Sequence, residues 1–137
     1  GTRSDRTEEE SKRAEESNSC LGQWPVQIKL APTRAAFFDD SELLIAADCT
    51  AYAFADFHER FMRGRITLIG WAETGFVDYS EKLTEIIRNN EIKSITVARM
   101  EVPCCGGIEL AVKKAAAAAG KSLPVEVFTI STRGCIL

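Results

Sequence analysis

Two neighbouring cysteines, Cys104 and Cys105, stand between a proline and the pair Gly106 and Gly107 in the stretch EVPCCGGIEL. Side chains next to each other in a chain point in different directions, so two such thiols rarely both belong to a plain apolar core. Thiolates are nucleophiles and soft metal ligands, and a third thiol, Cys49, follows an apolar run earlier in the chain. These residues predict a metal site with Cys49, Cys104 and Cys105 as ligands. Gly106 and Gly107 would let the backbone pass close to a bulky inorganic group.

The composition argues against several classes of partner. The 137 residues carry 17 bases and 20 acids, a net charge of −3, without a basic stripe, so we expect no nucleic-acid partner. No apolar run approaches the roughly 18 residues that a membrane-spanning helix needs, so we expect no membrane partner and a cytoplasmic location. In that reducing compartment, five cysteines at irregular spacing predict metal ligands or reactive thiols rather than disulfides.

The chain divides into a charged linker and one domain. Residues 1–19 contain six acids and four bases and no apolar residue larger than alanine, so they cannot offset the entropy of ordering. We expect a disordered linker there, and one cysteine-bearing α/β domain over residues 20–137. The chain starts without methionine, which suggests a fragment of a longer protein.

The domain repeats a simple alternation of apolar runs and helical patterns. Five short runs, PVQIKL, ELLIAAD, RITLIG, SITVARM and VEVFTIS, predict about five strands. Residues 52–62, 79–89 and 108–119 predict helices, which end at Gly64, Asn89–Asn90 and Gly120. Nearly continuous apolar strands that alternate with helices indicate an α/β fold, a small doubly wound and mostly parallel sheet flanked by helices.

Ligands of an open parallel sheet bind beyond the carboxyl ends of its strands. Four cysteines follow predicted strands and should meet at that edge: Cys49, Cys104, Cys105 and Cys135. The helix predicted over residues 108–119 would point its N-terminal amides at this site and stabilise thiolates.

Other residues favour structural roles. Cys20 and Cys135 are more typical of packing than of ligation, and His58 is more typical of a partly buried helical residue. The chain has no Ser/His/Asp set and no Walker or dinucleotide glycine pattern.

Several long stretches carry a family resemblance. LGQWPVQIKLAP, LLIAADCTAYAFADFHERF, DYSEKLTEIIRNNEIKSITVARMEVPCCGG and VEVFTISTRG resemble the C-terminal domain of prokaryotic four-iron four-sulfur (4Fe-4S) ferredoxin-type iron–sulfur binding proteins. The resemblance implies a 4Fe-4S cluster and electron transfer, with a ferredoxin module on the same chain or another redox protein as partner. Residues 1–3 resemble the end of the family's linker, so the ferredoxin module would be absent here.

One position departs from the pattern of that family. The family has a further cysteine where this chain reads GWAETG, and Trp71 takes its place. Three thiolates could still hold a cluster with one open iron, or a different metal. Two alternatives remain: a cysteine-based redox enzyme, in which Cys104 or Cys105 is the nucleophile and Glu101 or Glu109 handles protons, and a non-catalytic interaction domain. An electron carrier or redox accessory domain is favoured over a stand-alone enzyme.

Overall fold

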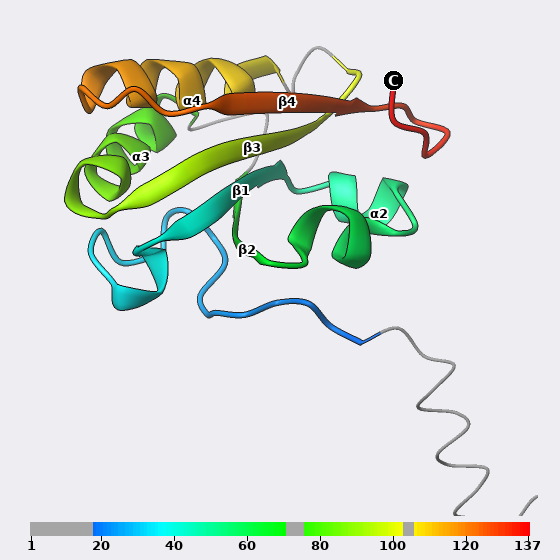
Figure 1. Cartoon of the computed structure of the whole chain (residues 1–137). Coiled ribbons are helices and arrows are strands. Elements are labelled where there is room, and N and C mark those ends of the chain that lie inside the picture. Colours follow the sequence, from blue (N-terminus) through cyan, green and yellow to red (C-terminus); the bar gives the residue numbers. More distant parts are fainter. Residues whose placement is uncertain (1–17, 71–75, 103–105) are drawn as a thin grey trace, which may run out of the picture.

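The computed structural model describes residues 18–70, 76–102 and 106–137. Its centre is a parallel four-stranded sheet in the order β2-β1-β3-β4, formed by β1 (Ser41–Ala47), β2 (Arg65–Gly70), β3 (Ile92–Met100) and β4 (Val125–Ile130) (Figure 1). The chain steps outward from β1 to β2 and then returns past β1 to β3. This reversal is the mark of a doubly wound sheet and confirms the predicted α/β fold class.

Helices cover both faces of the sheet. The connection from β1 to β2 contains α2 (Thr50–Ala53) and a π-helical turn, η2 (His58–Met62), on one face. The helices α3 (Phe76–Asn89) and α4 (Gly106–Ala118) pack side by side on the other face (Figure 1). A short 3-10 turn, η1 (Ala36–Phe38), precedes β1. In the described part of the chain, no helix is long and apolar enough to cross a membrane.

The central strand β1 divides the core into two apolar layers. Its side chains alternate between the faces, so Leu43 and Ile45 join the layer under α3 and α4, and Leu44 and Ala46 join the layer under η2. The apolar side of α3 consists of Leu83, Ile86 and Ile87, which are at most 2% exposed. The sequence pattern predicted this helix face, and burial explains why it is apolar.

The first predicted strand, in PVQIKL, is reduced to a single parallel bridge between Gln27 and Ile69. Two ladder hydrogen bonds form, from Ile69 N–H to Val26 O (2.8 Å) and from Ile28 N–H to Ile69 O (2.9 Å). The strand goes no further because the Leu30 N–H turns back to the Gln27 carbonyl (3.0 Å). The described sheet therefore has four strands rather than five.

We call residues 18–31 the strap, because this segment covers the outer edge of β2. Beyond the bridge, the Gln23 side chain pairs with the backbone of Thr67: its amide N–H donates to the Thr67 carbonyl, and its oxygen accepts from the Thr67 N–H at 3.2 Å. A side-chain amide thus takes the place of a strand peptide group. The predicted linker lies almost wholly outside the described residues, which begin at Asn18.

The helix predicted over residues 52–62 is broken into α2 and η2. Phe54 leaves the helical region, with φ −103° and ψ 112°. Its ring meets Phe61 edge to face at 5.5 Å, and Phe57 lies 5.2 Å from the same ring. Aromatic residues have weak helix propensity, so the packing of these rings decides the backbone path.

The helix ends follow the prediction at two glycines and differ at one asparagine. Gly64 and Gly120 have φ of 74° and 72°, the left-handed conformation that ends a helix. Asn90, in contrast, ends α3 with its side chain, whose Nδ2 donates to Ile86 O (2.8 Å) and Thr33 O (2.9 Å). Its Oδ1 accepts from Arg34 Nη1 (2.8 Å) and the Ala35 N–H (3.2 Å).

We expect Asn90→Ala to lower the free energy of unfolding by about 3 kcal/mol, because it leaves buried backbone groups without partners. Urea unfolding measures the change. The neighbouring Asn89 is exposed, and Asn89→Ala is the matched control with an expected change below about 0.5 kcal/mol. Equal effects of the two substitutions would contradict the role assigned to Asn90.

Candidate functional site

The turn after β1 places Cys49 at the carboxyl edge of the sheet. The Asp48 N–H donates to the carbonyl of Gly70, the last residue of β2, at 3.1 Å. The fully buried Thr50 donates its hydroxyl to the Ala47 carbonyl at 2.7 Å and fixes the turn. Cys49 itself is exposed and starts α2, with its carbonyl accepting from the Ala53 N–H at 3.0 Å.

The connection from β3 to α4 is held at both ends by Arg99. Its Nη1 forms an ion pair with Glu109 Oε1 on α4 at 3.0 Å, and its Nη2 donates to the Val102 carbonyl at 3.5 Å. Between Val102 and α4 the chain carries Cys104 and Cys105, which, with Pro103, lie outside the described residues. The described chain therefore stops at Val102, before the predicted ligands Cys104 and Cys105, and resumes at Gly106, the first residue of α4.

The carboxylates proposed for proton transfer both have structural partners. Lys113 Nζ lies 2.8 Å from Glu109 Oε2, on the side of the carboxylate opposite Arg99. The hydrogen bond from Lys113 and, second in size, that from Arg99 lower the pKa of Glu109. Glu101 accepts hydrogen bonds from the backbone N–H (2.7 Å) and the hydroxyl (3.2 Å) of Thr132 in the turn after β4. Both carboxylates hold segments of the edge in place.

The other two described cysteines lie in the turn after β4 and in the strap. Cys135 is exposed rather than packed, in the turn after β4, where its N–H donates to Ser131 Oγ at 3.1 Å. Cys20 is half-buried in the strap, and its N–H donates to Nδ1 of the half-buried His58 at 3.0 Å. Within residues 18–70, 76–102 and 106–137, no three His, Cys, Asp or Glu side chains come together as a metal site.

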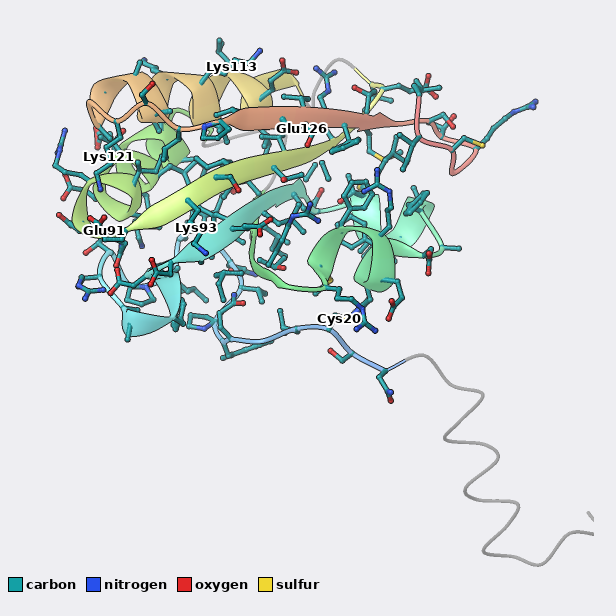
Figure 2. All side chains as sticks on the ribbon, in the orientation of Figure 1. Cys20, Glu91, Lys93, Lys113, Lys121 and Glu126 are labelled. Carbon is teal, nitrogen blue, oxygen red and sulfur yellow. The ribbon has the colours of Figure 1, made fainter. Side chains whose placement is uncertain are left out.

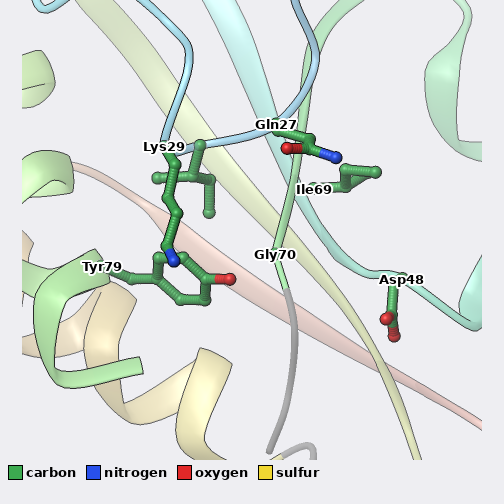
Figure 3. A pocket seen from close by; sticks show the side chains of 7 residues that line it. Gln27, Lys29, Asp48, Ile69, Gly70 and Tyr79 are labelled. Carbon is green, nitrogen blue, oxygen red and sulfur yellow. The ribbon is translucent and has the colours of Figure 1, made fainter. Parts of the chain in front are cut away.

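A small hollow opens beside Asp48 at the ends of β1 and β2 (Figure 3). It has a volume of about 20 Å³, enough for a water molecule and too small for an organic ligand. Its lining comes from the strap, β2, α3 and the turn after β1: Gln27, Ile28, Lys29, Asp48, Ile69, Gly70 and Tyr79. Asp48 and Gly70 are the last residues of the predicted strands ELLIAAD and RITLIG, so the sequence indicates both at this edge. It missed Lys29 and Tyr79, because the strap and α3 reach this place only through the tertiary fold.

The comparisons with known proteins agree with this geometry. The profile of a family described as Rossmann-like domain matches residues 35–137. The chain belongs to the Rossmann-like domain family. A protein of Archaeoglobus fulgidus, described only as uncharacterized, is 30% identical over 114 residues, which cover 83% of this chain and 81% of that protein. No solved structure matches.

This family assignment corrects the resemblance that the sequence suggested. The prediction of a ferredoxin-type iron–sulfur binding family was wrong: the matching profile is that of a Rossmann-like domain, and the relative carries no iron–sulfur description. The quoted stretches are mainly strands, a sheet-covering helix and their turns, which any Rossmann-like domain requires.

In a Rossmann-like domain, the ligand crevice opens where the strand order reverses. Here the reversal lies between β1 and β3, the strands that precede Cys49 and the Cys104–Cys105 pair. The turn after β1 reads Asp48-Cys49-Thr50, without the glycines that let a dinucleotide pyrophosphate approach, and the helix that follows has four residues. The turn after β1 thus presents an exposed thiol, Cys49, in place of a phosphate-binding turn.

We expect Gly70→Ala to lower the free energy of unfolding by about 1–3 kcal/mol through overpacking. A Cβ at Gly70 would lie 2.8 Å from Tyr79 Cε2 and 3.0 Å from Ile28 Cδ1. Thermal unfolding measures the loss. Gly22→Ala is the control, because a Cβ there meets no atom within 4 Å. An unchanged Gly70→Ala protein would show that Tyr79 does not pack against β2.

We expect Glu109→Gln to lower the free energy of unfolding by about 1 kcal/mol at neutral pH. The folded-state pKa of Glu109 lies below its ordinary value of 4.5, so its ion pairs stabilise the fold above that value. This stabilisation is lost as the pH falls through the lowered pKa, and the variant and the native protein should then converge. Denaturant unfolding over a pH series tests this, with a substitution of the exposed β4 residue Glu126, Glu126→Gln, as control. A difference that persists in strong acid would contradict it.

Proposed function

We propose that this domain binds a 4Fe-4S cluster through Cys49, Cys104 and Cys105 and takes part in electron transfer. One observation carries the proposal: the parallel pairing of β1 with β3, which runs to Ala46 opposite Ala98. It brings the end of the strand before Cys49 next to the end of the strand before Cys104 and Cys105. Cys49 and the pair Cys104–Cys105, 55 and 56 positions apart in the chain, would thereby meet at one edge of the sheet.

The surroundings of the crevice support a thiolate ligand set. The helix α4 has 13 residues, and its first turn presents backbone N–H groups, which favour negative charge. Among the described residues, a Cβ at Gly106 would meet only Arg99 Nη1, at 3.7 Å, so their packing does not require glycine there.

A bound cluster would supply one-electron chemistry at this edge. The protein's own residues would set its conditions: Cys49 holds the group at an exposed position, and the α4 amides stabilise its negative charge. Arg99 keeps the segment that carries Cys104 and Cys105 attached to α4. Exposure of Cys49 suits exchange of electrons with a separate redox protein, which is the partner we propose.

The ligand set has three thiolates rather than four. Trp71, where a fourth thiol was expected, offers no ligand atom and lies outside the described residues. A cluster held by three thiolates has one iron open to solvent or to an exogenous ligand. We therefore propose a cluster with a unique iron at this edge.

Anaerobic reconstitution with iron and sulfide tests the proposal. We expect the native protein to acquire iron, acid-labile sulfide and the broad visible absorption of sulfide-bridged iron. Cys49→Ser should lose most of the bound iron, because a hydroxyl is a poor replacement for a thiolate. Cys135→Ser is the matched control, an equally exposed thiol in the turn after β4, and should keep the native iron content.

The other outcomes identify the alternatives. Equal iron in the native, Cys49→Ser and Cys135→Ser proteins would exclude the proposed ligand set. No iron uptake, with rapid alkylation of Cys104 or Cys105, would favour a cysteine-based redox enzyme. Neither iron uptake nor a reactive thiol would leave a non-catalytic interaction domain.

A further inference from the structure

The strap is fastened at its start by the single histidine of the chain. The Cys20 N–H donates to His58 Nδ1 at 3.0 Å, and the two residues are 38 positions apart in sequence. Figure 2 labels Cys20 at the point where the strap comes onto the domain. A ring nitrogen that accepts a hydrogen bond from a backbone amide carries no proton, so this contact requires a neutral imidazole.

Farther along the strap, the hydrogen bonds involve backbone groups, the Gln23 side chain and Lys82, whose Nζ donates to the Lys29 carbonyl at 3.0 Å. Gln23 pairs with the backbone of Thr67, and Val26 and Ile28 pair with the backbone of Ile69. In the described part of the chain, the bond to His58 is the one hydrogen bond that ties the backbone of residues 18–22 to the domain. The backbone attachment at the start of the strap therefore depends on one ring nitrogen, beside the packing of Cys20 and Leu21 against the apolar layer under η2.

We propose that His58 is a pH-sensitive latch for the strap. Protonation turns His58 Nδ1 from an acceptor into a donor. It removes the hydrogen bond from the Cys20 N–H and leaves two N–H groups facing each other. Residues 18–22 then lose their backbone hydrogen bond to the domain and are held by the packing of Cys20 and Leu21 against the apolar layer under η2, while the strap remains hydrogen-bonded from Gln23 onward. This loosening does not depend on a bound cluster.

The ionisable groups around this junction come from three elements. On and after η2, Glu59 and Arg63 form a double ion pair, with distances of 2.8 and 2.6 Å. From the strap, the Cys20 thiol lies 3.8 Å from Glu59 Oε2. From β2, Arg65 Nη1 donates to the Phe61 carbonyl at 2.8 Å. The other charged side chains of this stretch, both exposed, are Asp56 and Arg60.

The charged groups around the junction do not take part in the latch. Glu59 is already neutralised by Arg63, and the pKa of Glu59 is lowered, first by its hydrogen bond from Arg63, so it stays ionised when His58 gains a proton. The pKa of Arg63 is raised, first by its hydrogen bond to Glu59, so Arg63 also stays charged. The group at this junction whose hydrogen bond to the strap backbone is removed by a proton is therefore the imidazole.

Amide hydrogen exchange of the full chain, resolved by residue, tests the latch. Between about pH 7.5 and about pH 5, we expect the protection factor of the Cys20 amide to fall about tenfold, the loss of one hydrogen bond. The Ile28 amide, which donates to Ile69 O at 2.9 Å, is the internal control and should keep its protection factor. An unchanged protection factor at Cys20 over this range would overturn the proposal.

Two substitutions separate the latch from a general effect of acid. His58→Asn offers a neutral carbonyl near the position of Nδ1, so the Cys20 amide should stay protected at both pH values. His58→Phe removes the acceptor, so the Cys20 amide should exchange about tenfold faster at both. The same acid-induced loss in His58→Asn as in the native protein would also overturn the proposal.

Discussion

The parallel pairing of β1 with a strand on each side is the interaction on which the rest of this structure depends. Leu44 and Ile45 in its middle are fully buried, one facing each layer, so β1 organises both halves of the core at once. Its pairing with β3 also sets the place where the strand order reverses, and with it the crevice. Stability and the candidate site therefore share one element, and a change of register in β1 would disturb both.

Features that depend on local pattern could be predicted, and features that depend on contacts between distant residues could not. The apolar runs of β1 to β4 and the buried side of α3 follow from periodicity, and the position of Cys49 follows from the end of a strand. The first run failed as a strand because a turn at Gln27 cuts it short. The bonds from Gln23 to Thr67 and from Cys20 to His58 span 44 and 38 residues, and no local signal marks them.

The family assignment separates fold from function in this chain. Dinucleotide-binding Rossmann domains place a glycine-rich turn and the start of a long helix directly after the first strand. In this protein, the same place holds a carboxylate, a thiol and a helix of four residues. The scaffold and its crevice are retained, while the chemistry at the first turn is different. Any activity must therefore be argued from Cys49 and its neighbours, since the fold alone allows many.

The side chain of Gln23 has a consequence for how the molecule behaves in crowded solution. Unpaired rims of β-sheets recruit strands from other molecules and so lead to aggregation. The Gln23 side chain caps the edge of β2 at Thr67, because its amide offers one donor and one acceptor but no further backbone. A strand from another molecule therefore cannot pair with β2 at that position. On the opposite rim, the Leu137 N–H occupies only the Thr129 carbonyl, at 2.8 Å. Lateral self-assembly of the described domain would thus begin along the first half of β4.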